Sequence, residues 1–377
     1  MDDVIPLSQP TFGAEEVEAV RSTLQSGWVA GQGPRGGDLE NAFRQLTGAE
    51  HAVAVSNCTA ALHLTLLAFG VGPGDEVVVS DYTYPATGHA VLFTGARPAF
   101  VDVRPDTGTM NPGAVEAAIT ARTKGILAVD VFGQCADYEP LRKLADEHGL
   151  FVVEDAAAAV GARYQGQPAG SLAAAACFSL HARKGITSGE GGVIVSDDPR
   201  VASSARMLSC FGVKSAYERQ DSEDLPVPSF EVLGYNYKLS DIQAAIAVVQ
   251  VDRLPALREA RQRVAARYGE LLALIEGIEL PEVAEDREHT WQSYVVTLDA
   301  GVSRGRVAQQ LRQRGIQANI GTFASHLQPV YEDPAPCPVS ARLFRRHLAI
   351  PMHANLSDAD IERVADALSS VVADELR

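Results

Sequence analysis

The sequence predicts an α/β fold: a mostly parallel, seven-stranded sheet covered by helices on both faces, followed by a smaller C-terminal α+β domain. The main observation is a series of short apolar runs separated by helical patterns, because strands buried on both faces read as continuous apolar segments. A second is the length of 377 residues, enough for a large and a small domain with ample core. A third is a change of pattern near residue 250, which places a large domain at 1–250 and a small one at 251–377.

The first expected element is an amphipathic helix over residues 12–26, with apolar side chains spaced for one face: Val17, Val20 and Leu24. A glycine-rich loop from Trp28 to Gly37 follows, and it contains a formal GxGxxG pattern from Gly31 to Gly36. We reject a dinucleotide site because the pattern follows a helix instead of a strand, and Pro34 lacks the backbone N–H that a pyrophosphate would bind. We interpret the segment as a flexible loop near a site. The N-terminal segment is a candidate to pack on the small domain.

Seven apolar runs predict the strands of the sheet: Ala52–Val55, Val77–Val79, Ala99–Val103, Gly125–Val131, Leu150–Val153, Ala175–Leu180 and Val193–Val195. Helical patterns fill most of the gaps, for instance residues 112–121 and 138–148. Ligands of parallel sheets bind at the carboxyl ends of the strands. The residues that follow these runs are therefore the first candidates for a site.

After the sheet, residues 213–231 are polar, acidic and proline-containing, and we interpret them as a surface excursion or lid. A long helical stretch over about 240–275 leads into the small domain. There we expect a strand, a helix and a second strand, followed by two closing helices; the first three lie at 293–298, 303–314 and 316–320. The last helix opens at Ser357 with an N-cap and acidic residues in its first turn.

Composition and charge exclude several classes of protein. A net charge of −16 and a pI near 5.0 argue against nucleic acid or an anionic membrane as a partner. Five widely spread cysteines without a Cys-x-x-Cys pair, and nine histidines without metal-ligand spacing, predict free thiols and no metal site. The N-terminus lacks the features of a signal peptide, and no apolar run is long enough to span a membrane. We therefore expect a cytoplasmic protein.

The first candidate functional residue is Lys184, which lies between two predicted strands beside the glycine-rich segment Ser188–Gly192. Glycines let a cofactor approach the backbone closely. A lysine in such a place is suited to form the Schiff base that holds pyridoxal phosphate (PLP). A solvated lysine at a strand end explains this stretch equally well on its own.

Three further features stand at strand ends. Asp155 ends the fifth run, where a carboxylate can pair with the pyridine nitrogen of PLP or cap the next helix. Ser56–Leu62 opens a helix whose N-terminal N–H groups and Thr59 hydroxyl suit a phosphate, although the same residue types are ordinary caps. Tyr84 follows the next strand and offers a ring that stacks on a cofactor or simply packs. Together with Lys184, their order along the chain favours PLP.

Longer motifs extend over nearly the whole chain: IPLSQPTFGAEEVEAV, SGWVAGQGP, SNCTAALHL, GPGDEVVV, GARPAFVDV, FGQ, VVEDAAAAVGA, SLHARKGITSGEGG, GYNYKLSDIQAAIA, RGIQANIGTFASHLQPVY and LAIPMHANLSDADIERV. In these motifs the chain resembles the sugar aminotransferases of the DegT/StrS family, which are PLP-dependent transferases of fold type I. The resemblance implies that fold for the large and small domains.

The resemblance also implies a role for each matching position. Lys184 would form the Schiff base with PLP and move the proton, Asp155 would face the pyridine nitrogen, and Tyr84 would stack on the ring. The phosphate would be held by Cys58, Thr59 and Ser179. Asn236 would reach the phosphate of a neighbouring subunit, which implies a homodimer with active sites at the interface. Trp28 with its loop, and the small domain, would shape the substrate entrance.

Departures from the family pattern concern the substrate. Ala158 stands where the family has Gln near the cofactor, so a hydrogen bond is lost and room is gained. The family's Leu-Arg-x-His-Gly is Leu208–Gly212 here, without two of its polar groups. Lys238 replaces an Arg, which weakens a bidentate contact to a carboxylate or phosphate. Dehydratases of the family carry His in place of the lysine, so the intact Lys184 favours amino transfer.

Weaker candidates are His181 and His326 for substrate contact, and Arg183 for a donor carboxylate or a structural ion pair. We predict a PLP-dependent aminotransferase that takes an amino group from L-glutamate or L-glutamine. Its acceptor is by resemblance a keto-sugar, a nucleotide-linked 3- or 4-ketohexose, in deoxyaminosugar or secondary-metabolite biosynthesis. One alternative is the same chemistry on a cyclitol or another non-nucleotide ketone. Another is a non-catalytic PLP-binding regulatory protein.

Overall fold

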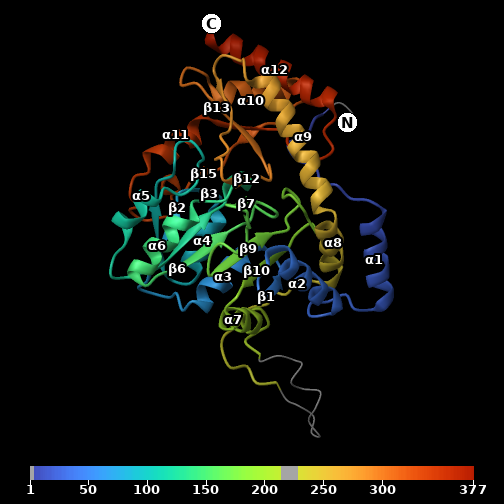
Figure 1. The fold of residues 1–377 in the computed structure, drawn as a ribbon, viewed down its shortest axis with the longest axis vertical. Helices are drawn as coiled ribbons and strands as arrows, with labels where there is room; N and C mark the ends of the chain where they lie inside the picture. The colour runs from blue at the N-terminus through green and yellow to red at the C-terminus, as the bar shows by residue number, and fades with distance from the viewer. Residues whose placement is uncertain (1–3, 214–227) are drawn as a thin grey trace.

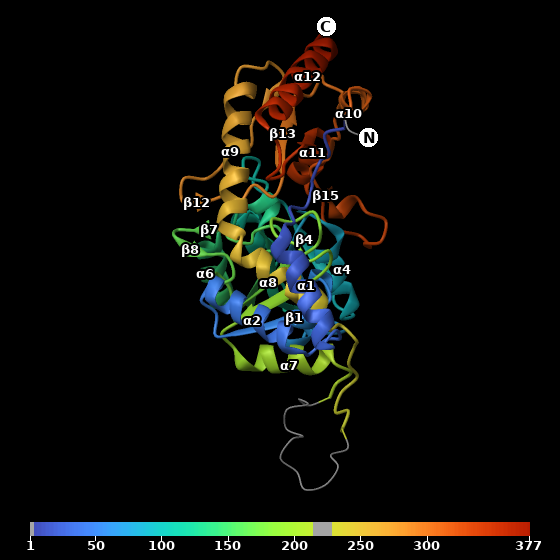
Figure 2. The same ribbon diagram turned by 90° about the vertical axis from the view of Figure 1, so that its right-hand side faces the viewer.

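A computed structural model describes residues 4–213 and 228–377 (Figure 1). The elements from the middle of the chain form one end of the molecule, and the C-terminal elements form the other, with both chain termini beside them (Figures 1 and 2). Most of the excursion or lid expected over 213–231 lies outside the described residues. Within the described ranges, no helix is long and apolar enough to cross a membrane.

The seven predicted strands pair into one sheet, in the order β1-β10-β9-β6-β5-β2-β4. Their bounds are β1 His51–Val55, β2 Glu76–Ser80, β4 Arg97–Val101, β5 Thr123–Val129, β6 Phe151–Asp155, β9 Ala175–Ser179 and β10 Gly192–Ser196. β10 runs antiparallel to both of its neighbours, whereas the remaining pairings are parallel. The prediction of a mostly parallel seven-stranded sheet is therefore confirmed.

Successive residues of a strand point to opposite faces of the sheet. Each face therefore carries an apolar core, and helices cover both faces. One apolar core contains Val78 and is covered by α2 (Pro34–Thr47), α6 (Tyr138–His148) and α8 (Asp241–Asp252). The other core contains Val77 and Val79 and is covered by α3 (Cys58–Ala68), α4 (Pro85–Phe93) and α7 (Pro199–Ser209). The helix expected over 112–121 is shorter, because α5 spans Pro112–Val115 and a 3₁₀ turn follows.

α1 (Ala14–Ser26) confirms the N-terminal helix, but its apolar face points into neither core. The Val17 and Leu24 side chains are 69% and 55% exposed, respectively. The buried side of α1 is polar instead, since Glu16 accepts hydrogen bonds from Gln250 and Arg253 at 2.6 Å each. Figure 2 shows α1 lying on the outside of the large domain.

The glycine-rich loop expected over 28–37 ends earlier than predicted, because α2 begins at Pro34. The N–H groups of Arg35 and Gly36 donate to the Asp241 carboxylate, at 3.1 Å each. These donors are occupied within the fold, in agreement with the rejection of a dinucleotide site.

The C-terminal part is built on a four-stranded antiparallel sheet, in the order β11-β13-β16-β14. Its elements are α9 Leu254–Leu272, β11 Ile278–Glu279, β13 Tyr294–Leu298, α10 Arg304–Gln313, β14 Asn319–Ile320, α11 Pro338–Arg346, β16 His347–Ile350 and α12 Asp358–Leu376. The capping box expected at Ser357 is present, whereas β16 was not predicted. Ile5 of the N-terminal segment is buried in the core of this part, and its N–H donates to Gly315. On these contacts we propose a small domain of residues 251–377 to which the N-terminal segment adds.

The single helical stretch expected over 240–275 is two helices, α8 and α9, separated by Arg253. Pro255 in the first turn of α9 has no backbone N–H, and in a continuous helix its ring would clash with the carbonyl of the residue four positions earlier. Leu254 packs in the core that contains Val78, whereas Val264 packs in the core of the C-terminal part. α9 therefore contributes to both cores.

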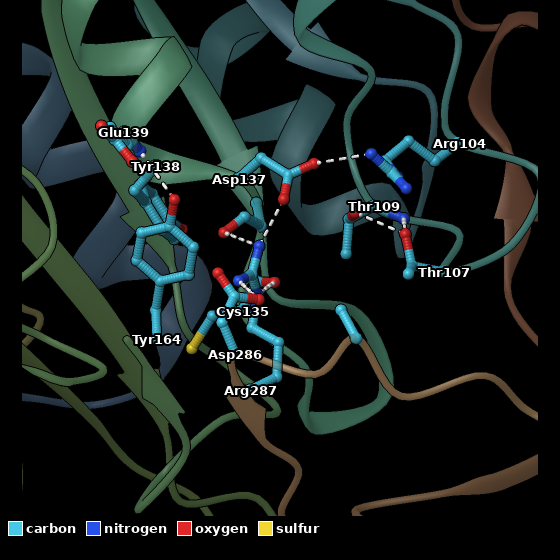
Figure 3. A network of polar contacts seen from close by, with 12 residues as sticks. Arg104, Thr107, Thr109, Cys135, Asp137, Tyr138, Glu139, Tyr164, Asp286 and Arg287 are labelled. Atoms are coloured by element: carbon cyan, nitrogen blue, oxygen red, sulfur yellow. Dashed lines mark hydrogen bonds and ion pairs between the residues drawn. The ribbon is translucent and has the colours of Figure 1, made fainter. Parts of the chain in front are cut away.

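Short strand pairs join the two domains. β3 (Tyr82–Thr83) pairs with β15 (Phe323–Ala324), and β12 (Arg287–Glu288) pairs with β7 (Arg163–Tyr164), which pairs with β8 (Gln167–Pro168). Figure 3 shows how Arg287 strengthens the second connection: its guanidinium donates to the Cys135 carbonyl and the Asp137 carboxylate. The same group lies 3.9 Å from the centre of the Tyr164 ring. The small domain is thereby fixed against the turn that follows β5.

Candidate active site

The ends of β1 and β9 meet across β10 at one edge of the large sheet. The pairing register aligns Val55 with Gly192, and Gly192 with Ser179. A Cβ atom at Gly192 would lie 2.5 Å from the carbonyl carbon of Asn57 and 2.7 Å from the Cys58 nitrogen, which no other residue type tolerates. Glycine at this position therefore lets the N-terminus of α3 approach the end of β9.

The N-terminus of α3 presents hydrogen-bond donors to this edge. Asn57 caps the helix, and its Oδ1 accepts a backbone hydrogen bond from the first turn at 2.8 Å. The other N–H groups of a first turn have no intrahelical partner and carry the positive end of the helix dipole. Cys58 is buried and Thr59 half-buried in this turn. Ser179 Oγ accepts from the His181 N–H at 3.3 Å, so its own proton is free to be donated to an anion.

Asp155 ends β6 with a carboxylate that is 4% exposed. Its Oδ2 accepts from Thr87 Oγ1 at 2.7 Å, and its Oδ1 accepts from the Ala157 N–H at 3.2 Å. Burial raises the pKa of Asp155, whereas the hydrogen bonds from Thr87 and Ala157 and the charge of Lys184 lower it. The carboxylate is thus held in one orientation by two donors that favour its charged form.

Lys184 lies in a turn after β9, where its N–H donates to the His181 carbonyl at 2.9 Å. Burial is the main cause that lowers the pKa of the Lys184 amine; Cys58 and Asp155 raise it, and Arg183 lowers it. A lowered pKa increases the neutral fraction, which is the form that attacks a carbonyl or accepts a proton. The structure therefore brings Lys184, Asp155 and Cys58 within electrostatic reach of one another.

Tyr84 is the N-cap residue of α4 and stands at the same edge, with 65% of its surface exposed. It directly follows Thr83, whose hydroxyl oxygen is 2.8 Å from that of Thr87. Its ring makes an edge contact with Phe323, at 6.0 Å between centroids. An exposed ring beside the Asp155 site is compatible with stacking on a planar ligand.

The two histidines predicted from the motifs are engaged with carboxylates. The His326 side chain is mostly buried: its Nδ1 lies 2.7 Å from Asp81 Oδ2, and its backbone N–H donates to Asp81 Oδ1. The Cys337 thiol lies near this pair, and the three potential ligand atoms are within 4.8 Å of one another. His181 Nε2 lies 3.7 Å from Glu190 Oε1 in a partly exposed pair. In the part of the chain that the structure describes, neither imidazole forms a hydrogen bond or ion pair with Lys184 or Asp155.

The remaining predicted residues lie on the surface of the single chain. Trp28 is 61% exposed, and Arg183 is also exposed. Asn236 is exposed as well, and its Oδ1 accepts from Lys238 Nζ. The Lys238 ammonium also lies 4.5 Å from the centre of the Phe211 ring. Within the described part of one chain, these side chains therefore form no hydrogen bond to the side chains of Lys184, Asp155 or Cys58.

The structure adds residues in contact with the candidate site that the sequence did not reveal. Thr87 holds the carboxylate of Asp155, and its only sequence signal was its place one turn after Tyr84 at a strand end. Gln292 Nε2 donates to the Arg183 carbonyl at 2.9 Å, and Arg261 donates to the Lys184 carbonyl at 3.4 Å. These long-range contacts hold the lysine turn from the small domain.

The residues at this edge fit PLP. A lysine amine with a lowered pKa, a fixed carboxylate, and a helix N-terminus with a serine hydroxyl match an aldehyde, a pyridine nitrogen and a phosphate. Asp155 does more than cap the segment that follows it, because it accepts a hydrogen bond from Thr87 of α4 in addition to the local one from Ala157.

Comparison with known proteins gives the same result over nearly the whole chain. The model of the DegT/DnrJ/EryC1/StrS aminotransferase family matches residues 10–369. The spore coat polysaccharide biosynthesis protein SpsC of Bacillus subtilis (strain 168) is 37% identical over 381 residues, which cover 98% of this chain and 97% of that protein.

Solved structures agree in fold as well as in sequence. The structure of DesI in the presence of its TDP-sugar product has a TM-score of 0.89 and 34% identity, covering 99% of this chain and 94% of that one. A protein from Streptococcus pneumoniae in its PLP form has a TM-score of 0.92 and 29% identity, covering 99% of this chain and 100% of that one.

Proposed function

Because the chain belongs to the DegT/DnrJ/EryC1/StrS aminotransferase family, and is thus a PLP-dependent sugar aminotransferase, we propose that it moves an amino group from L-glutamate or L-glutamine to a nucleotide-linked 3- or 4-ketohexose. The observation that carries the proposal is the convergence of Lys184, Asp155 and the α3 N-terminus at one edge of the sheet. We place the reaction in deoxyaminosugar or secondary-metabolite biosynthesis and the protein in the cytoplasm. Its five cysteines are all free, which supports a reducing compartment.

Each side chain of the candidate site has a separate role in the proposed reaction. PLP, when bound, supplies an electron sink for the carbon that loses or gains a proton. Lys184 would bind the cofactor covalently and carry the proton, for which burial prepares its amine by favouring the neutral form. Asp155 would pair with the pyridine nitrogen and keep it protonated. Cys58, Thr59 and Ser179 would hold the phosphate at the helix N-terminus, and Tyr84 would offer its ring for stacking.

A nucleotide-linked acceptor is supported by a relative: DesI, 34% identical, was solved with its TDP-sugar product. A chain with a net charge of −16 attracts no anion through its general field, so a diphosphate needs local donors. The exposed Arg183 and the half-buried Lys238 are the candidates for this contact. Trp28, His181 and His326 stay proposals for the substrate entrance.

We further propose a homodimer in which Asn236 reaches the phosphate of the partner's cofactor. Large apolar side chains are exposed on α1, on the loop that follows it and on the segment that precedes Asn236: Val17, Leu24, Trp28, Phe230 and Leu233. Exposed large apolar side chains are candidates for a protein interface. In the proposed dimer, a partner chain would cover the segment that precedes Asn236 and bring a second copy of Asn236 toward the site.

A cyclitol or another non-nucleotide ketone is the second candidate acceptor, and Ala158 favours it. The Ala158 carbonyl accepts from Thr290 Oγ1 at 3.3 Å, but its methyl side chain offers no hydrogen bond to a substrate or cofactor. A smaller side chain there leaves room for a different substrate shape. The non-catalytic alternative is not supported, because the family and its structural relatives are aminotransferases.

The acceptor is tested with a panel of ketones in the presence of L-glutamate. We expect formation of 2-oxoglutarate only with nucleotide-linked 3- or 4-ketohexoses, and the same panel with L-glutamine identifies the donor. Turnover with a free cyclitol ketone, and none with any nucleotide-linked sugar, would replace the proposal by the second candidate.

A further inference from the structure

A chain of hydroxyl groups leads from Asp155 toward the small domain. Thr87 Oγ1 donates to Asp155 Oδ2 at 2.7 Å, and Thr83 Oγ1 lies 2.8 Å from Thr87 Oγ1. Both threonines are 1% exposed, so their hydroxyl groups are shielded from solvent. Buried hydroxyl groups need partners inside the protein, and here each finds one in the chain.

The direction of these hydrogen bonds depends on the charge of Asp155. An ionised carboxylate only accepts, so Thr87 gives its single proton to Asp155 and its oxygen accepts from Thr83. The Ala157 N–H donates to the other carboxylate oxygen at 3.2 Å. Burial raises the pKa of Asp155, and the hydrogen bonds from Thr87 and Ala157 act against this by stabilising the charged form.

The three side chains are positioned by separate elements. Thr83 belongs to β3, where it pairs with Phe323 of β15 in the small domain. Thr87 lies in the first turn of α4, which begins at Pro85. Asp155 is the last residue of β6. The Asp155 carboxylate is therefore the point where the β3–β15 pair, the start of α4 and the end of β6 meet.

We propose that Thr87 is a positioning residue of the aminotransferase reaction, which orients Asp155 and stabilises its ionised form, and that Thr83 fixes the direction in which Thr87 donates. This inference rests on the proposed function, in which Asp155 faces the pyridine nitrogen of PLP. A fixed, charged carboxylate keeps that nitrogen protonated, whereas a neutral or rotated one does not. Through Thr83, the pairing of β3 with β15 becomes part of the support of the cofactor site.

The test compares Thr87→Val, which keeps the branched shape and removes the hydroxyl, with Thr87→Ser, which keeps the hydroxyl. Thr83→Val removes the donor to Thr87. For each protein we would measure the thermal midpoint without PLP, the dissociation constant of PLP by equilibrium dialysis, and the pH midpoint of the visible absorption change with PLP bound.

We expect Thr87→Val to weaken PLP binding about tenfold, because a hydrogen bond to a charged group contributes on that order. The visible pH midpoint should rise, because a less firmly protonated ring nitrogen withdraws less electron density from the nitrogen of Lys184. Thr87→Ser should stay within about twofold of wild type, and Thr83→Val should shift both quantities in the same direction by less.

A Thr87→Val protein with the PLP affinity and pH midpoint of Thr87→Ser would overturn the proposal. A lower thermal midpoint with an unchanged pH midpoint would also overturn it, because the role would then be structural only. If Thr87→Val does not fold, an unchanged pH midpoint in Thr83→Val is the contradicting result. Failure of the proposed function looks different: wild type itself would then show no visible band with PLP.

Discussion

Burial acts on Asp155 and Lys184 in the same sense, because it disfavours both the carboxylate and the ammonium ion. It raises the pKa of the acid and lowers the pKa of the amine. The charge of each residue stabilises the charge of the other. The hydrogen bond from Thr87 stabilises only the charge of the carboxylate. On balance the pKa of Asp155 is raised and that of Lys184 is lowered, while the hydrogen bonds from Thr87 and Ala157 and the charge of Lys184 oppose the loss of charge on Asp155. A PLP enzyme needs this combination for a protonated ring nitrogen and a mobile proton.

Asp155→Asn tests the charge of the carboxylate at nearly constant shape. We expect the half-reaction with the amino donor to slow on the order of 10²-fold, because the amide no longer keeps the ring nitrogen protonated. The rate of bleaching of the visible PLP band after addition of L-glutamate measures this effect. The exposed Asp146→Asn change is the matched control and should leave the rate unaltered. A rate for Asp155→Asn within about threefold of wild type would remove the carboxylate from the mechanism.

At the scale of elements, apolar runs were sufficient to predict every strand of the large sheet, because strands buried on both faces have a strong local signal. β16 was not predicted because it has only four residues and follows α11 directly, without turn residues between the two elements. The break between α8 and α9 was signalled by Pro255, but the flanking helical pattern outweighed it. Boundaries and short strands therefore depended on tertiary packing.

The site was predictable in part for the same reason. Lys184, Asp155 and Cys58 stand at strand ends, and the topology of a parallel sheet brings strand ends together. For Thr87 a place near a strand end was not enough, because its hydrogen bond to Asp155 exists only when α4 packs beside β6. The periodicity of α1 predicted an apolar face correctly, but not that Val17 and Leu24 on it are exposed, since periodicity does not show what covers a face.

Gly192→Ala tests the close approach between β10 and the N-terminus of α3. The added methyl group would lie 2.5 Å from the Asn57 backbone, so that turn must move away from Ser179. We expect PLP affinity to fall by at least about tenfold and stability by roughly 1–3 kcal/mol. Gly185→Ala is the matched control, since nothing lies within 4 Å of the Cβ position at Gly185 and its φ is not positive. Equal PLP affinities of the two variants would contradict the account of this turn.

At the scale of the whole molecule, buried histidines make the small-domain region sensitive to acid. Burial lowers the pKa of His289 to about 3, and of His347 and His353 to about 4, from an ordinary value of 6.5. The unfolded chain therefore binds protons more readily than the folded one between pH 6.5 and these values. Stability is present above pH 6.5 and falls as the pH drops, by up to about 1.4 kcal/mol per pH unit for each histidine.

We expect His353→Leu to reduce this dependence on pH. Urea unfolding at a series of pH values between 6.5 and 4 gives the slope for each protein. The slope should decrease by up to about 1.4 kcal/mol per pH unit in His353→Leu. His148→Gln on the surface of α6 should retain the wild-type slope. An unchanged slope in His353→Leu would show that this histidine is not buried in its neutral form.

The proposed dimer predicts that only one of two highly exposed leucines lies at the subunit interface. Leu233 is 88% exposed beside the Asn236 segment, and Leu274 is 95% exposed after α9. Leu233→Asp should dissociate the dimer at micromolar concentration and lower PLP affinity, because a buried charge at an interface is costly. Leu274→Asp should do neither. Light scattering after gel filtration gives the mass of each protein, and a wild-type monomer with full activity would contradict the dimer.

The most direct test of the account is the visible absorption spectrum of the wild-type protein and of Lys184→Ala, each with PLP and before and after addition of L-glutamate or L-glutamine. For wild type we predict a yellow band that is bleached by one of the donors, because Lys184 holds the cofactor and carries the proton. Lys184→Ala should show no donor-dependent change on the same timescale. A wild-type band that persists with both donors, or wild-type turnover by Lys184→Ala, would contradict the account.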